Sequence, residues 1–173
     1  DHLALRPEHT AGTMRAYLEH GMQSLPQPVL MYHSGPVFRH ENPQKGRYRQ
    51  FTGFDLDVYG SEKSIIDALV MRTAYTILQE SGASNLSIDI NSIGDRDCRP
   101  KYIRELTNYF KKHSKDLPAV DRERLANNPL RILDSKDPKT IALCADAPAM
   151  TDYLCADCKK HFREVISYLD QMS

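Results

Sequence analysis

The stretch GPVFRHENPQKGRYRQF, residues 35–51, decides the fold of this 173-residue chain. Strand-forming residues flank it on both sides, and the segment between them is polar, basic and broken by Gly46. Two such runs joined by a polar loop predict an antiparallel hairpin with a long tip. We therefore expect strands at residues 29–41 and 50–59, with a loop at residues 42–49.

Side chains alternate across a strand, so each predicted strand has two distinct faces. One face carries Arg39 and Glu41 beside Phe51 and two acids, Asp55 and Asp57. The opposite face of the second strand is more apolar. We expect that apolar face to belong to the core and to consist of Thr52, Phe54, Leu56 and Val58. The acidic face would then be an open binding surface.

The residue types on the open face suit a nucleotide. A guanidinium such as that of Arg39 offers a planar fork to a phosphate, and Phe51 offers a ring on which a base can stack. The loop adds Lys45, Arg47 and Arg49, which can close over phosphates or meet an RNA end. The alternative is a solvated basic hairpin tip with an incidental Arg–Glu pair, and the residues alone leave both interpretations open.

The remaining segments predict an α+β fold. Apolar periodicity indicates helices at residues 8–20 and 61–81, with Ser61 as the N-cap of the second, and strands at residues 3–6 and 86–91. After residue 94 only helical patterns remain, at residues 98–113, 120–126, 139–143 and 157–172. We place a domain boundary near Asp95.

Composition excludes several classes of protein. Lys and Arg number 23 and Asp and Glu number 23, so a nucleic-acid contact would need a local basic patch. No apolar run is long enough for a membrane span, and no signal peptide opens the chain. We expect a cytoplasmic protein with reduced thiols. Because the chain opens without Met and runs at once into a strand-like segment, we expect an internal piece of a longer protein.

Four segments in order resemble one family. Residues 35–51 resemble the second motif of class II aminoacyl-tRNA synthetases, in the form found in histidyl-tRNA synthetases. LALRPEHT at residues 3–10 resembles the histidine- and ATP-contacting segment just upstream. Residues 90–102 and 128–138, with residues 146–154, resemble the helical insertion that follows in bacterial members. The resemblance covers almost the whole chain.

This resemblance implies two domains along the chain. Residues 1–95 would be part of the class II catalytic domain, with its antiparallel sheet and flanking helices. Residues 96–173 would be the helical insertion domain, lying against the acceptor arm of the tRNA. The activity implied is ligation of histidine to tRNA(His) through a histidyl-adenylate, with ATP and Mg²⁺. The full-length protein would be a cytoplasmic homodimer that does not bind membranes.

The resemblance also assigns roles in ATP binding and tRNA binding. Arg39 would be catalytic and would hold the α-phosphate, and Glu41 would sit by the adenine. Phe51 would stack on the adenine, and Arg47 would approach the outer phosphates. Lys45 and Arg49 would meet the tRNA.

The histidine site implied by the resemblance contains Glu8, Thr10, Gly53 and Asp57. Gly53 is a departure, because the family usually has a glutamine there that contacts the bound histidine. Asp57 stands where many members have glutamate.

Two further functions remain possible from the sequence. One is the non-catalytic, synthetase-like regulatory subunit of an ATP phosphoribosyltransferase, although that paralogue lacks the helical insertion and the full basic loop. The other is a stand-alone RNA-binding module built on the helical part. The first and third class II motifs, the second histidine signature and the anticodon-binding domain are absent from these residues. We therefore expect that the chain alone cannot aminoacylate tRNA.

Cys155-x-x-Cys158-x-x-His161, with Cys144 upstream, has the ligand types of a zinc site. The set lacks a second CxxC pair, so we expect no metal here. We also expect His9 and His20 at the surface, His40 buried or at a sheet edge, and residues 121–124 as ordinary helix-surface charge.

Overall fold

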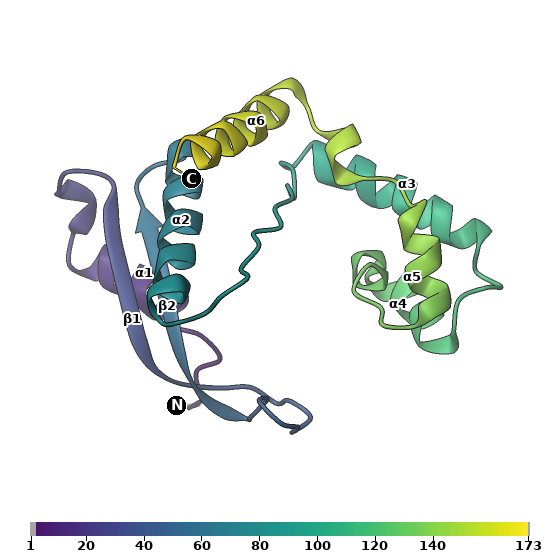
Figure 1. The fold of residues 1–173 in the computed structure, drawn as a ribbon, viewed down its shortest axis with the longest axis horizontal. Helices are drawn as coiled ribbons and strands as arrows, with labels where there is room; N and C mark the ends of the chain where they lie inside the picture. Colours follow the sequence, from purple (N-terminus) through teal and green to yellow (C-terminus); the bar gives the residue numbers. More distant parts are fainter. Residues whose placement is uncertain (1–2, 173) are drawn as a thin grey trace. The chain divides into compact units, whose positions relative to one another are not determined.

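A computed structural model describes residues 3–172 and has the predicted α+β fold (Figure 1). The chain forms two compact units, which meet in sequence between Ser84 and Asn85. The first contains α1 (Thr10–Glu19), β1 (Val29–Phe38), β2 (Gln50–Tyr59) and α2 (Ser64–Glu80). The second contains α3 (Cys98–Lys112), α4 (Ala119–Asn127), α5 (Pro138–Ala145) and α6 (Ala156–Gln171). Short 3-10 turns lie at Met22–Ser24, Pro129–Ile132 and Met150–Tyr153.

The predicted hairpin forms, and its second strand has the predicted bounds. β1 and β2 pair antiparallel, with Val37 opposite Phe51 and Gly35 opposite Gly53. β1 ends at Phe38, three residues before the expected end, so Arg39 and Glu41 lie beyond the strand. The backbone N–H of Arg39 still donates to the Arg49 carbonyl at 2.9 Å, which keeps the two arms together at the loop.

The acidic face is not the expected open surface, and the apolar face is core only in part, since Leu56 and Val58 are half-buried. α1 lies against the acidic face, where Thr13 donates to Asp57 at 2.7 Å and also bonds to the Tyr59 hydroxyl. On the face expected to be core, Thr52 and Phe54 are exposed. Polar groups on α1 hydrogen-bond to the carboxylates, so α1 can cover the acidic face without leaving a buried charge unpaired.

Two expected strands do not form among residues 3–172. Residues 3–6 and 86–91 adopt irregular backbone, although the Arg6 carbonyl accepts one bond from the Phe38 N–H at 2.9 Å. A strand needs a neighbour to take its backbone bonds, and β1 and β2 pair only with each other. α2 also begins later than expected, at Ser64, with Lys63 as its N-cap in place of Ser61.

The helical unit has its own core along α3. Tyr102, Leu106 and Phe110 recur every four residues and are buried, which is the spacing of one helix face. Their core includes Cys98, Leu117, Ile132, Met150 and Leu154. No helix in the described part of the chain is long and apolar enough to cross a membrane.

Asp121 is 1% exposed, so the expectation of surface charge at residues 121–124 was wrong for this residue. Its carboxylate accepts from Ser135 at 2.6 Å and from Thr140 at 2.8 Å, and it pairs with Arg124 at 2.9 Å. Burial by itself would raise the pKa of Asp121, but these bonds outweigh burial and hold the pKa below its usual value. The charge therefore stays buried and ties the start of α4 to α5.

Candidate functional site

The loop end of the hairpin carries the four residues expected to bind ATP as two pairs, Arg39 with Phe51 and Arg47 with Glu41. The Arg39 guanidinium lies over the Phe51 ring, 5.4 Å from its centroid. Arg39 Nε donates to the Pro7 carbonyl at 3.1 Å, which fixes the stem of the side chain against the N-terminal segment. The terminal nitrogens of Arg39 are then the donors that can reach an anion beside an aromatic ring.

Glu41 and Arg47 pair within the loop itself. Arg47 Nε lies 3.4 Å from a Glu41 carboxylate oxygen, and a backbone bridge joins Gln44 to Arg47. Gly46 makes this tight turn possible, because its φ is +79°. Lys45 at the tip and Arg49 at the base are exposed. The loop thus presents basic side chains on a defined turn.

The N-terminal segment and α1 form an open pocket of about 720 Å³ on the same unit. Glu8, expected to contact histidine, is exposed and lines this pocket. Thr10 is the first residue of α1, and its carbonyl accepts from Thr13 Oγ1 at 3.0 Å. Asp57 is held by Thr13, as described above. Neither Thr10 nor Asp57 lines the pocket.

His9 is the residue that sequence reasoning missed, because it was expected at the surface and is 3% exposed. Its Nδ1 bonds to Asp55 at 2.6 Å, and its ring stacks on His33 with centroids 4.0 Å apart. The Nε2 atom is buried without a hydrogen-bond partner among the described residues, and His9 lines the pocket. The alternation of β2 placed Asp55 on this face, but no local pattern linked it to a histidine 46 residues away.

The other histidines and the cysteines are also placed. His20 is exposed as expected, whereas His40 is exposed and not buried. Cys144 donates to the Ile132 carbonyl. Among the described residues, the one group with metal-ligand geometry contains Cys155 and Cys158 but neither Cys144 nor His161.

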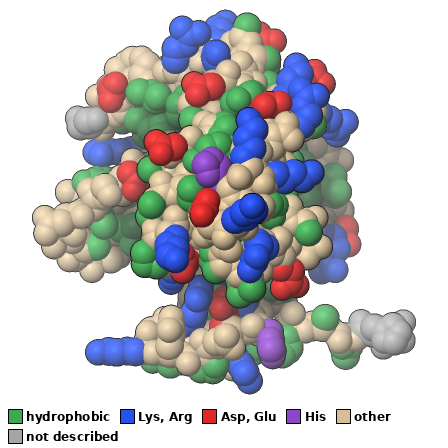
Figure 2. All heavy atoms as spheres, turned by 90° about the vertical axis from the view of Figure 1, so that its right-hand side faces the viewer, with side chains coloured by type: hydrophobic (Ala, Val, Ile, Leu, Met, Phe, Trp, Pro, Cys, Tyr) green, Lys and Arg blue, Asp and Glu red, His purple; other side chains and the backbone are tan. Residues whose placement is uncertain are grey.

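The helical unit shows no single basic field on the face drawn in Figure 2. Lys and Arg side chains are interleaved there with acidic and hydrophobic ones. This mixed surface agrees with the zero net charge of the chain. This face therefore does not supply the concentrated basic patch that a stand-alone RNA-binding module needs.

The model of the tRNA synthetase class II core domain (G, H, P, S and T) matches residues 1–166, and the chain belongs to this family. Within it, the chain is similar to histidine–tRNA ligases. Its sequence is 46% identical to the histidine–tRNA ligase of Desulforamulus reducens, over 97% of this chain and 40% of the relative. It is 47% identical to that of Dictyoglomus turgidum over 99% of this chain and 42% of the relative.

A solved structure agrees with these matches. The apo histidyl-tRNA synthetase of Staphylococcus aureus superposes with a TM-score of 0.66 at 33% identity, covering 96% of this chain and 38% of that one. The chain therefore spans about 40% of the length of the curated relatives that it matches.

Proposed function

We propose that this chain supplies the ATP-binding hairpin and a helical tRNA-facing unit of a histidine–tRNA ligase. The observation that carries the proposal is that Arg39 lies over Phe51 and Arg47 pairs with Glu41, both pairs at the loop end of the hairpin. The similarity to histidine–tRNA ligases over nearly the whole chain supports histidine as the amino acid. The whole enzyme would act as a cytoplasmic homodimer on histidine and tRNA(His).

The reaction proposed is attack of the histidine carboxylate on the α-phosphorus of ATP, with release of pyrophosphate. Charge builds on the phosphate oxygens, so a fixed guanidinium that strengthens its bonds at that moment accelerates the step. Arg39 has this role because Pro7 and Phe51 hold it in place. Arg47 would neutralise the outer phosphates, and Phe51 would carry the adenine on the ring area that Arg39 leaves open.

The residues present fit ATP by their chemistry, since the hairpin offers two guanidinium groups and an aromatic face. Mg²⁺, where bound to the phosphates, would supply further charge neutralisation. Glu41 is paired with Arg47 and would face the adenine amino group.

The helical unit would face the acceptor arm of the tRNA, and Lys45 and Arg49 on the hairpin loop would contact the tRNA end. Glu8, Thr10, Asp57 and the space beside Gly53 would receive the histidine. Of these residues only Glu8 lines the pocket beside His9, so the pocket supports the assignment of Glu8 alone.

A chimaera tests the proposal. In it, these residues replace the matching segment of the Staphylococcus aureus histidyl-tRNA synthetase. We expect ATP–pyrophosphate exchange that depends on histidine and on none of the other 19 amino acids. Arg39→Ala should lower kcat by about 100-fold to 1,000-fold, the usual effect of removing one transition-state donor.

Arg72→Ala is the matched control, because Arg72 also stacks on an aromatic ring, that of Tyr75, but on α2. It should leave exchange unchanged. A folded chimaera that activates a different amino acid, or an Arg39→Ala variant as active as the control, would contradict the proposal.

A further inference from the structure

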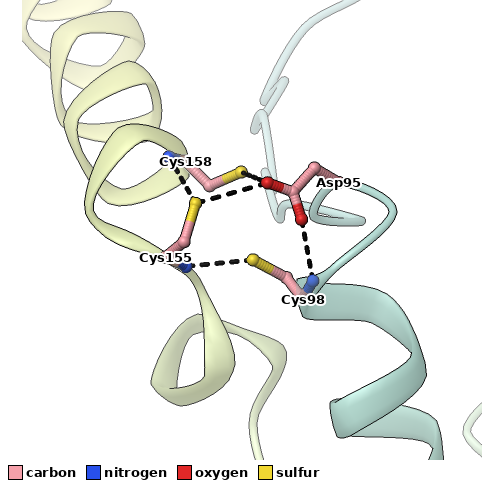
Figure 3. Close-up of side chains that lie close together, drawn as sticks. All are labelled: Asp95, Cys98, Cys155 and Cys158. Carbon is pink, nitrogen blue, oxygen red and sulfur yellow. Dashed lines mark hydrogen bonds between the residues drawn. The ribbon is translucent and has the colours of Figure 1, made fainter.

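The start of α3 and the start of α6 meet at a group of four side chains that the proposed reaction does not use. Asp95, Cys98, Cys155 and Cys158, here named the Asp–Cys cluster, point toward one another (Figure 3). Their potential ligand atoms, one carboxylate oxygen and three sulfurs, all lie within 4.8 Å of one another. All four residues belong to the helical unit.

We propose that the Asp–Cys cluster binds one zinc ion as a four-coordinate structural site. The ligands form two pairs of equal spacing, Asp95-x-x-Cys98 and Cys155-x-x-Cys158. Two pairs with two intervening residues each are the usual ligand pattern of structural zinc sites. The pair Asp95-x-x-Cys98 does not match a CxxC pattern, because its first residue is an aspartate.

The distances suit this ion. Tetrahedral zinc with Zn–S near 2.3 Å and Zn–O near 2.1 Å places neighbouring ligand atoms about 3.6–3.8 Å apart. Asp95 Oδ2 already lies 3.3 Å from Cys155 Sγ and 3.5 Å from Cys158 Sγ. The widest separation in the cluster is within 4.8 Å, so side-chain rotations suffice to close it.

Two of the sulfurs accept backbone hydrogen bonds. The Cys155 N–H donates to Cys98 Sγ at 3.0 Å, and the Cys158 N–H donates to Cys155 Sγ at 3.4 Å. Cys98 opens α3, and Cys158 lies in the first turn of α6. The charge of a bound zinc ion would deprotonate the thiols, and these amide donors would then support the sulfurs as ligands.

The chain bends sharply to bring the first pair into place. Gly94 has a φ of +65°, and a Cβ at this position would collide with the Met150 side chain and approach Cys98 Cβ to 2.8 Å. Asp95 then accepts from the Cys98 N–H at 2.7 Å, so its Oδ1 closes the turn while Oδ2 faces the sulfurs. This turn orients both ligands of the pair.

Ordinary packing does not account for the composition of the cluster. Apolar thiol packing gathers sulfurs with hydrocarbon, whereas here a carboxylate contacts two sulfurs directly. Three soft sulfur donors favour zinc over the hard ions Mg²⁺ and Ca²⁺. With four protein ligands, no position stays open for catalysis, so the ion would be structural.

Zinc binding is expected to cross-link two segments that lie 57 residues apart in the sequence. Zinc would join the start of α3 to the start of α6 beside Met150 and Leu154 of the core. Binding to the folded unit alone would raise its stability by mass action.

Metal analysis of the whole chain tests the site. The 173-residue protein, purified under reducing conditions with an affinity tag free of histidine and cysteine, should contain about one zinc per chain. Replacement of zinc by Co²⁺ should produce the intense visible absorption of tetrahedral thiolate coordination. A chelator should lower the melting temperature of the helical unit, and added zinc should restore it.

Variants separate ligands from other thiols. Cys158→Ser and Asp95→Ala should each weaken zinc affinity by more than about 100-fold, beyond the loss seen for residues that only support a ligand. Asp95→Cys should keep one zinc, because it preserves four ligands. Asp95 is exposed, so its variants should fold even if the cysteine variant does not.

Cys144→Ser is the matched control, since Cys144 is a half-buried thiol of the same unit outside the cluster. It should bind zinc as the unaltered chain does. The proposal is overturned by a reduced, folded chain that stays below stoichiometric zinc when zinc is in excess. Iron in place of zinc, or zinc retained by the Asp95→Ala and Cys158→Ser variants, would overturn it equally.

Discussion

Gly53 and His9 show how one small residue changes the surroundings of the proposed histidine site. A Cβ at Gly53 would lie 3.3 Å from Val37 Cγ2, which is tighter than most side-chain contacts, and 3.4 Å from His9 Cε1, which is the near limit of ordinary contact. The His9 ring thus occupies space that a longer side chain at position 53 would need.

Gly53→Gln should lower the free energy of unfolding of the hairpin unit by about 1–3 kcal/mol, because it overpacks the site. His9→Ala removes the ring that a longer side chain at position 53 would meet. The double variant should therefore lose less free energy of unfolding than the two single variants lose in sum. Chemical denaturation of all four proteins measures the coupling. Glu62→Gln, an exposed change in the same unit, is the control. Additive losses would show that the two residues do not compete for space.

At the scale of elements, local patterns located the hairpin and the helices well. β2 and the body of each helix follow from alternation and from the recurrence of apolar residues every three or four positions. Local patterns failed where an element depends on a neighbour. Residues 86–91 alternate like a strand, but among the described residues no strand lies beside them. The local sequence predicts that Asp121 is surface charge, whereas in the fold it accepts hydrogen bonds from Ser135 and Thr140.

Asp121→Asn should destabilise the helical unit by about 1–3 kcal/mol at pH 7, because an amide cannot accept all the bonds that the carboxylate accepts. The pKa of Asp121 is lowered in the folded state. Its contribution is therefore complete above the ordinary carboxyl pKa of about 4 and is lost as pH falls through the lower folded value. The difference in free energy of unfolding between the variant and the unaltered chain should therefore become smaller below about pH 4.

Denaturant unfolding followed by circular dichroism from pH 7 to pH 3 measures this dependence. The exposed Asp89→Asn variant serves as the control and should match the unaltered chain throughout. A gap that stays constant to the lowest pH would contradict the role assigned to the charge.

At the scale of the whole molecule, the two units divide the chemistry. The hairpin unit carries the residues proposed to bind ATP and histidine, and the helical unit carries its own core and the Asp–Cys cluster. The sheet of the described chain has two strands and hence two open edges, which a class II catalytic domain would cover with further strands.

The chain alone should not catalyse histidine-dependent ATP–pyrophosphate exchange, since it spans about 40% of the length of its relatives. Catalysis by positioning needs every contact to the substrate in place. The assay compares the isolated chain with the chimaera at equal concentration. Exchange by the isolated chain at rates near those of the chimaera would refute this expectation.

The amino-acid sequence by itself determined the hairpin, the order of the helices and the placement of Arg39, Glu41, Arg47 and Phe51 in and beside its loop. These features depend on alternation, turn residues and short spacings, which act over a few residues. Only the tertiary structure decided which hairpin face α1 covers and that His9 pairs with Asp55. It alone joined Asp95 and Cys98 to Cys155 and Cys158. Such pairings depend on the packing of distant segments, and no local pattern specifies that packing.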